Sequence, residues 1–391
     1  MLDTPFSPWP SYTEEEANAA RDVILSNRVN YWTGQECREF EKEFAEWAST
    51  GHAIALANGT VALDVALIAM GIGSGDEVVV TSRTFLASAS SIVNAGAIPV
   101  FADVDADSQN ITADSIRAVL TPRTRAIICV HLAGWPCDMD PIMELAHEHG
   151  LWVIEDCAQA HGSLYKGRPV GSIGHVGAWS FCQDKIMTTG GEGGMVTTSD
   201  RELWSKMWSF KDHGKNWEAV YEREHAPGFR WLHESFGTNW RMTEVQAAIG
   251  RIQLQRMPQW QAQRQAYAER IWSAAAQCKG LRVPEVPADI RHAAYKCYVF
   301  VDPAALAQGW DRDRILGEIN AAGVPCYSGS CSEIYLEKAF DDTGWRPEQP
   351  LPVARQLGET SLMFLVHPTL TQAEVDKTCA VLCDVMQEAT K

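Results

Sequence analysis

Between about residues 50 and 200, short apolar runs alternate with stretches of helical character. Seven of these runs are candidate strands, at 53–57, 77–81, 99–102, 126–131, 152–155, 177–181 and 195–198. Most are apolar at nearly every position, as expected for strands whose two faces are both covered. Strands that alternate with helices in this way are typical of a parallel sheet flanked by helices.

Helix signals lie between the runs and beyond them. The stretch 60–70 begins beside the Asn58-Gly59-Thr60 turn, and the stretch 138–149 closes on Gly150. A longer helical pattern follows Arg241 to about residue 276 and is interrupted at Pro258, where we place a domain boundary. A strand at 295–301 and helices at 312–322 and 371–388 complete the chain.

These elements predict an α/β protein with two domains. Residues 1–257 would form a large domain around a mostly parallel seven-stranded sheet, and residues 258–391 a smaller C-terminal α+β domain. A length of 391 residues suits two packed domains, and 46% hydrophobic residues suffice for a sizeable core.

Composition narrows the classes of partner. The chain has 33 basic and 50 acidic residues, a net charge of −17, which disfavours nucleic acid and anionic membranes as partners. No export signal and no run of about 18 apolar residues is present, so we expect a cytoplasmic protein. Its eleven cysteines are then read as reduced thiols, and none has the spacing of a metal site.

The candidate chemistry lies in an order of three features. A strand ends in Asp156, Lys185 follows the next strand, and a glycine-rich loop spans 190–194. Ligands of open α/β sheets bind at the carboxyl ends of strands, where Asp156 falls. Pyridoxal phosphate (PLP) requires an amine for its aldehyde, an anion near its ring nitrogen and donors for its phosphate. Lys185 and Asp156 would supply the first two.

The phosphate would sit where Gly59 and Thr60 open a helix, because free N–H groups and the helix dipole favour an anion there. Ser180 could add a hydroxyl. Each feature has a plainer interpretation when taken alone. A strand-terminal Asp often caps a helix, a single lysine is usually a solvated charge, and glycine loops are commonly simple turns. The combination is what favours the cofactor.

Taken together, the motifs resemble the sugar-nucleotide aminotransferases of fold type I, PLP enzymes of the aspartate aminotransferase superfamily. The resemblance runs from Tyr31 to about Arg251. It is carried by Trp32-Thr33-Gly34, Phe40-Glu41, Asn58-Gly59-Thr60 with Ala62-Leu63, Thr84-Phe85, Asp103-Val104-Asp105, Asp138-Met139-Asp140, residues 155–162, Ser180-Phe181, Lys185 and residues 191–194. It implies amino transfer, by analogy from glutamate, to the keto group of a nucleotide-linked deoxysugar for polysaccharide or antibiotic synthesis. Pyridoxamine phosphate would form in the half-reaction.

The resemblance also implies roles for single residues. Phe85 would stack on the cofactor ring, and Gln159 would hydrogen-bond its phenolic oxygen, although core packing and helix capping are their plainer roles. Asn239 would reach the cofactor phosphate of a neighbouring subunit, so a homodimer with shared sites is expected. Four residues could meet the substrate: His161, His213, Arg241 and Tyr327.

Two positions depart from the family pattern. His175 stands where relatives usually carry an acidic residue in a turn, a change of little expected consequence. Residues 325–332 stand where many relatives have a histidine-rich stretch near the sugar, which leaves the sugar, its nucleotide and amination at C3 or C4 undetermined.

Two alternative functions fit the same fold. The first is a PLP-dependent sugar dehydratase, which would carry histidine at the position of Lys185. A silent scaffold of the same fold is disfavoured by the presence of Lys185, Asp156 and Ser180.

Overall fold

The computed structural model describes residues 4–224, 228 and 230–391. Its centre is a seven-stranded sheet in the order β1-β9-β8-β5-β4-β2-β3. The strands are β1 (His52–Leu56), β2 (Glu77–Thr81), β3 (Ile98–Ala102), β4 (Thr124–Val130), β5 (Trp152–Asp156), β8 (Val176–Ser180) and β9 (Gly194–Thr198). Neighbours from β8 to β3 pair in parallel, whereas β9 runs antiparallel to β1 and β8. All seven predicted strands are confirmed; β2 has the predicted ends, and no end of the others is shifted by more than two residues.

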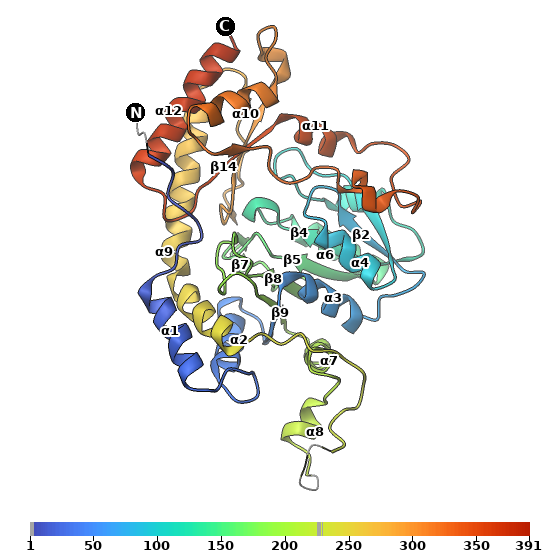
Figure 1. Ribbon diagram of the computed structural model, residues 1–391. Coiled ribbons are helices and arrows are strands. Elements are labelled where there is room, and N and C mark those ends of the chain that lie inside the picture. Colours follow the sequence, from blue (N-terminus) through green and yellow to red (C-terminus); the bar gives the residue numbers. More distant parts are fainter. Residues whose placement is uncertain (1–3, 225–227, 229) are drawn as a thin grey trace.

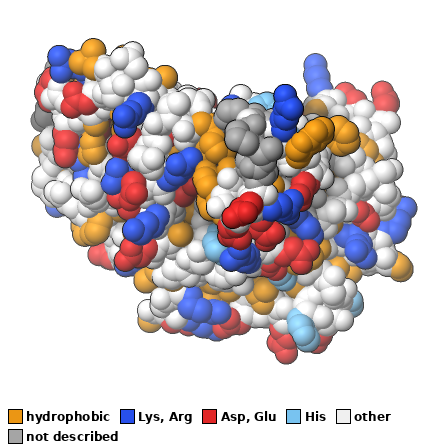
Figure 2. Space-filling view, turned by 90° about the horizontal axis from the view of Figure 1, so that it is seen from below, with side chains coloured by type: hydrophobic (Ala, Val, Ile, Leu, Met, Phe, Trp, Pro, Cys, Tyr) orange, Lys and Arg blue, Asp and Glu red, His pale blue; other side chains and the backbone are white. Residues whose placement is uncertain are grey.

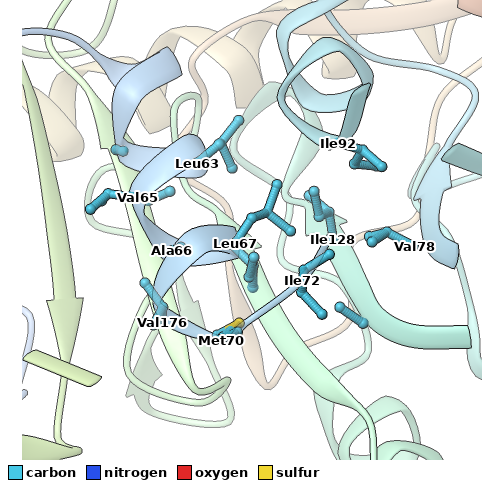
Figure 3. Close-up of a cluster of buried hydrophobic side chains, with 14 of the residues drawn as sticks. Leu63, Val65, Ala66, Leu67, Met70, Ile72, Val78, Ile92, Ile128 and Val176 are labelled. Carbon is cyan, nitrogen blue, oxygen red and sulfur yellow. The ribbon is translucent and has the colours of Figure 1, made fainter. Parts of the chain in front are cut away.

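Helices cover both faces of this sheet (Figure 1). Those on one face are α3 (Gly59–Ala69), α4 (Ala87–Asn94) and α7 (Arg201–Lys211); α5 (Ala113–Arg117), α6 (Met139–His149), α2 (Glu36–Trp47) and the start of α9 cover the other. Successive strand residues alternate between these layers. Val78 and Val80 pack with α3, whereas Val79 packs with α6. Figure 3 shows the first layer, where Leu63 and Leu67 of α3 meet Ile92 of α4 and Ile128 of β4.

Beyond the large sheet, the C-terminal part is α+β, as predicted. A four-stranded sheet has the order β10 (Leu281–Arg282), β12 (Cys297–Val301), β14 (Ser361–Phe364) and β13 (Cys326–Tyr327). It packs against α10 (Arg312–Ala321), α12 (Gln372–Ala389) and the second half of α9, while its other face meets the large domain. Between β13 and β14 lie two 3-10 turns, η3 (Ile334–Leu336) and η4 (Lys338–Phe340), and α11 (Pro352–Thr360).

The long helix α9 (Glu244–Ala275) joins the two parts and contains Pro258 in its interior. The expected interruption at Pro258 is therefore wrong. Proline removes one backbone hydrogen bond from a helix. Here α1 (Glu14–Leu25), α2 and α12 pack along α9 and support it. The boundary between residues 257 and 258 stays a prediction that the helix itself does not mark.

Three smaller features complete the chain. Strands β6 (Leu164–Tyr165), β7 (Arg168–Pro169) and β11 (Ile290–Arg291) form a separate small sheet. Residues 213–224 and 230–239, with α8 (Trp217–Tyr221), project from the body next to α7, and we call them the arm (Figure 1). Among the residues described, none of the helices combines the length and the apolar character that crossing a bilayer requires.

Candidate active site

Two neighbouring parallel strands bring the predicted acid and amine to one edge of the sheet. Asp156 is the last residue of β5, and its register partner is Ala178 of β8. β8 ends at Ser180, so the chain leaves the sheet beside Asp156 and reaches Lys185 in a loop. The glycine-rich segment of this loop returns the chain into antiparallel β9. The loop that carries Lys185 therefore starts and ends at the edge that carries Asp156.

Helix α3 points its N-terminus at the same edge. Asn58 caps the helix by accepting the N–H of Val61 at 3.0 Å. A Cβ on Gly59 would lie 2.5 Å from Cβ of Ser180, so only glycine allows α3 to approach β8 this closely. The first N–H groups of a helix have no partner within it. An anion at this helix end would meet these groups and the Ser180 hydroxyl.

The Asp156 carboxylate is buried, with 6% of the residue exposed. Burial raises the pKa of Asp156, and a hydrogen bond from the Ser88 hydroxyl opposes that rise. Ser88 Oγ lies 2.8 Å from Asp156 Oδ2, and the Ala158 N–H lies 3.1 Å from Oδ1. Thr84 Oγ1 lies 3.1 Å from Ser88 Oγ and extends the chain of hydroxyls. This set of contacts holds the carboxylate in one orientation.

Lys185 has a half-enclosed amine with 17% of its side chain exposed. Its Nζ lies 3.9 Å from Asp184 Oδ1 and 5.2 Å from the centre of the Tyr295 ring. The Tyr295 hydroxyl donates to Asp184 Oδ2 at 2.5 Å, and the Trp9 indole N–H donates to the backbone oxygen of Lys185 at 2.9 Å. Contacts from the N-terminal segment and the C-terminal domain thus fix the lysine loop.

A pocket of about 670 Å³ joins these groups. Seven residues predicted from the sequence line it: Gly59, Thr60, Phe85, Asp156, Gln159, Ser180 and Lys185. The volume is in the range of small-molecule and cofactor sites. Amine and carboxylate therefore open into one cavity, the arrangement on which the enzymatic interpretation depends.

Phe85 and Gln159 are placed differently in this pocket. The Phe85 ring is 72% exposed, so it is not packed in the core and is free to cover a ligand. Gln159 is nearly buried, and its Oε1 accepts the Ala133 N–H at 2.8 Å. Its NH₂ group is therefore left as the donor, which suits an oxygen of a ligand.

His161, a substrate candidate, does not line the pocket. The residue is fully buried, and its ring lies 5.3 Å from that of Trp179 and 5.7 Å from that of Phe181. Burial lowers the pKa of His161 to about 3, so the ring is neutral. Within the described part of the chain neither ring nitrogen has a hydrogen-bond partner. A direct contact of His161 with substrate finds no support in this position.

The other substrate candidates and Asn239 also lie outside the pocket of their own chain. Asn239 and His213 are exposed on the arm, and Arg241 pairs with Asp212 at 2.7 Å. Tyr327, 48% exposed, is on β13 of the C-terminal sheet. His175 is structural: its Nδ1 accepts the Val153 N–H at 2.9 Å.

Sequence reasoning missed several residues that line the pocket. Ser88 lies four residues after Thr84, in the first turn of α4, so its closeness in sequence to Thr84-Phe85 could have connected it to the pocket. Cys182 and Asp184 precede the lysine, and Glu192 belongs to the glycine-rich loop. Of these, Ser88 has the clearest role because it contacts the buried carboxylate directly.

A second buried cluster, His131, Glu155 and Cys157, brings three potential metal ligands together. Hydrogen bonds already engage the first two. His131 Nε2 lies 2.9 Å from Glu155, its Nδ1 accepts the Cys137 N–H, and Glu155 also accepts N–H groups from residues 171, 173 and 174. These bonds hold the turn after β7 against β5, so we interpret the cluster as structural.

The pocket suits PLP on its own chemistry. It offers a primary amine, a buried carboxylate, the free N–H groups of a helix N-terminus beside a hydroxyl, and an exposed aromatic ring. These are the groups that bind the aldehyde, ring nitrogen, phosphate and ring face of this cofactor.

Comparisons with known proteins agree with this chemistry. The sequence model of the DegT/DnrJ/EryC1/StrS aminotransferase family matches residues 10–383. The chain is 38% identical to GDP-perosamine synthase of Caulobacter vibrioides over 377 residues, which cover 94% of this chain and 95% of that protein. Among solved structures it is similar to an aminotransferase from Psychrobacter cryohalolentis, with 65% identity, a TM-score of 0.97 and coverage of 99% and 100%. DesV of S. venezuelae, solved in complex with a ketimine intermediate, is 32% identical with a TM-score of 0.88 and coverage of 98% and 99%.

Proposed function

The chain belongs to the DegT/DnrJ/EryC1/StrS aminotransferase family, and from this premise we propose that it transfers an amino group to a keto sugar carried by a nucleotide. It is a PLP-dependent aminotransferase. The observation that carries the proposal is the shared pocket of Lys185 and Asp156, beside the N-terminus of α3. The sugar-nucleotide acceptor is inferred from GDP-perosamine synthase, to which the chain is similar over nearly its whole length.

Bound PLP supplies an electron-withdrawing ring that stabilises negative charge on the substrate carbon next to the amino nitrogen. Asp156 would keep the ring nitrogen protonated, because a buried carboxylate favours a positive partner. Gly59, Thr60 and Ser180 would hold the phosphate, and Phe85 would cover the ring. The NH₂ group of Gln159 would donate to the phenolic oxygen.

Lys185 would act twice. Its amine would hold the aldehyde carbon of the cofactor, and when an amino acid has displaced it, the free amine would move a proton at the substrate carbon. Asp184, whose Oδ1 lies 3.9 Å from Lys185 Nζ, would stabilise the positive charge of the protonated lysine. Glutamate is the expected donor.

We further propose that two copies of the chain share their sites. The arm exposes Trp231 by 84% and Phe236 by 98%, unusual for large apolar side chains that remain in water. Figure 2 views the molecule from the end of the arm and shows hydrophobic side chains among charged ones on this face. A partner would cover these rings and bring Asn239 to the phosphate of the neighbouring site. Analytical ultracentrifugation tests the dimer. A cytoplasmic location stays a prediction.

The proposed reaction is tested with the cofactor's own absorption. Purified protein with PLP is expected to show a visible band that glutamate bleaches and that a nucleotide-linked keto sugar restores. Lys185→Ala should fold normally and lack the lysine-bound band, whereas Lys206→Ala, an exposed lysine of α7, should behave like the parent. A lysine-bound band that persists in Lys185→Ala would show that Lys185 is not the residue that binds the cofactor aldehyde. Silence toward every donor would favour a scaffold.

A further inference from the structure

Arg83 is a fully buried guanidinium that contacts both domains. It follows β2 in the loop that carries Thr84 and Phe85 into the pocket, and none of its surface is exposed. Nε donates to Gln109 Oε1 at 3.0 Å, on the side of the large domain. The other contacts are to the C-terminal part of the chain.

Nη1 of Arg83 donates to Ser332 Oγ at 2.7 Å and to the Ser330 backbone oxygen at 3.4 Å, and Nη2 donates to Ser361 Oγ at 2.8 Å. The guanidinium also lies 5.5 Å from the centre of the Tyr298 ring. These residues belong to the segment after β13, to β14 and to β12. One side chain therefore joins three parts of the C-terminal domain to the pocket loop.

The acceptors around Arg83 are neutral. Burial without a carboxylate partner lowers the pKa of Arg83 and makes its charge costly to keep. An uncharged side chain would fill the same space at a smaller desolvation cost. Arginine does offer five donors in a rigid plane, and four bonds to two domains use this geometry.

Two hydrogen bonds from backbone N–H groups tie the start of the pocket loop to the large sheet: the Ser82 N–H donates to the Ala102 oxygen at 3.3 Å, and the Arg83 N–H donates to Thr81 Oγ1 at 3.2 Å. Phe85 is largely exposed, so burial of its ring contributes little to holding the loop. The backbone oxygen of Ser82 accepts the Ile334 N–H at 3.0 Å, so the loop is tied to the C-terminal part of the chain by the backbone of Ser82 as well as by the side chain of Arg83. Downstream, Thr84 meets Ser88, which holds Asp156. A shift at Arg83 would thus reach both the ring face and the carboxylate of the site.

We propose that Arg83 is a positioning residue that fixes the Thr84–Phe85 wall of the pocket against the C-terminal domain. The proposal rests on the proposed function, because it assigns Arg83 to the seating of the cofactor. It makes the Pro325–Ser332 segment a support of the pocket wall through Ser330 and Ser332. The geometry of the site then depends on how the two domains are docked.

Arg312 provides a matched control. It donates to the backbone oxygens of Gly358 and Ser361, at 3.0 and 2.9 Å, and so braces the same end of β14 without touching the pocket loop. Arg83→Met and Arg312→Met each remove a guanidinium from this region. Both variants should lower the melting temperature, but only the first should change the pocket.

Two readouts distinguish a positioning role from a structural one. In the chain without cofactor, hydrogen–deuterium exchange of residues 82–88 should be faster in Arg83→Met and unchanged in Arg312→Met. In PLP titrations followed by the visible band, Arg83→Met should bind about tenfold or more weakly, a loss of about 1.4 kcal/mol in binding free energy. Arg83→Lys, which retains the charge and some donors, should recover part of the affinity.

Equal exchange and equal PLP affinity in the two methionine variants would overturn the proposal, leaving Arg83 as a stabilising residue only. If Arg83→Met does not fold, Arg83→Lys takes its place in both experiments. Exchange at residues 82–88 and PLP affinity equal to those of the parent in Arg83→Lys would then overturn the proposal. Failure of the parent to bind PLP would instead refute the proposed function. The exchange experiment would still decide whether Arg83 orders the loop.

Discussion

Removal of the Ser88 hydroxyl is the most specific test of the site, because this hydroxyl contacts Asp156 and is not itself proposed to contact the cofactor or substrate. Ser88→Ala removes the 2.8 Å bond to Oδ2 and leaves the carboxylate with the Ala158 N–H as its remaining bond. Hydrogen bonds to charged groups contribute about 1.5–3 kcal/mol. The loss should raise the Asp156 pKa by about one unit or more, since one unit corresponds to about 1.4 kcal/mol.

The direction of the pH effect follows from the raised pKa of Asp156 in the parent. In the proposed site the cofactor binds the ionised carboxylate, so a further rise of the Asp156 pKa should weaken binding most at low pH. We expect Ser88→Ala to bind PLP about tenfold more weakly near pH 6, with the deficit shrinking as the pH increases. In the chain without cofactor, a buried acid with a raised pKa favours the folded state while protonated. Ser88→Ala should therefore lose more stability near pH 8 than near pH 5.

The assay is a titration with PLP between pH 6 and 9, followed by the visible band, beside urea unfolding of the cofactor-free chain. Ser90→Ala is the control, because Ser90 is in the same helix and its hydroxyl bonds to the Ala87 backbone oxygen rather than to Asp156. If both variants bind PLP with the parent's affinity and pH dependence, the reasoning about Asp156 is wrong.

Three further perturbations test other parts of the structure. Gly59→Ala should weaken PLP binding at least about tenfold, because the added Cβ would contact Ser180. Gly317→Ala in α10, which has open space around it, should instead stabilise the fold by up to about 1 kcal/mol; PLP titrations and thermal melts of both variants test the two expectations. Phe85→Ala should change unfolding free energy by less than about 0.5 kcal/mol because the ring is exposed, yet reduce PLP affinity several-fold through lost stacking; parental affinity would remove Phe85 from the site. Glu155→Gln should lower the free energy of unfolding, measured in urea, by about 1–3 kcal/mol, because the new NH₂ group would face N–H donors. The pKa of Glu155 is lowered in the folded protein, so the difference from the parent should fade as the pH drops below that pKa, and the exposed control Glu148→Gln should show neither effect.

The fold was predictable from the sequence because its strands are short apolar runs between turn signals. Each of the seven lies within two residues of its prediction, and the helix before Gly150 ends on that glycine in a left-handed conformation. Pro258 misled because a local rule for helix breaks was applied to a helix supported by packing over its length. The support comes from α1, α2 and α12, which are far from Pro258 in sequence.

Seven of the residues predicted for the site line one pocket because the topology places them there, whereas contacts that depend on long-range packing were not predicted. Asp156 and Lys185 follow adjacent parallel strands, so strand order alone brings them to one edge. The burial of His161 between two aromatic rings, by contrast, depends on contacts that no local pattern encodes. The bond from Ser88 to Asp156 joins residues 68 positions apart.

The reversal of the chain at β9 explains why so many of the candidate site residues lie at one edge of the sheet. A parallel continuation after β8 would have carried the chain away from the carboxyl ends through a crossover. Antiparallel β9 instead starts where β8 ends, with Ser180 opposite Gly194, so residues 181–193 must remain above that edge. A Cβ on Gly194 would lie 2.2 Å from the Asn58 oxygen, so glycine at this corner is also what lets α3 begin beside the loop. The Lys185 amine, the Asp156 carboxylate and the N-terminus of α3 thus converge through one strand reversal and two glycines, Gly59 and Gly194, that allow close backbone approach.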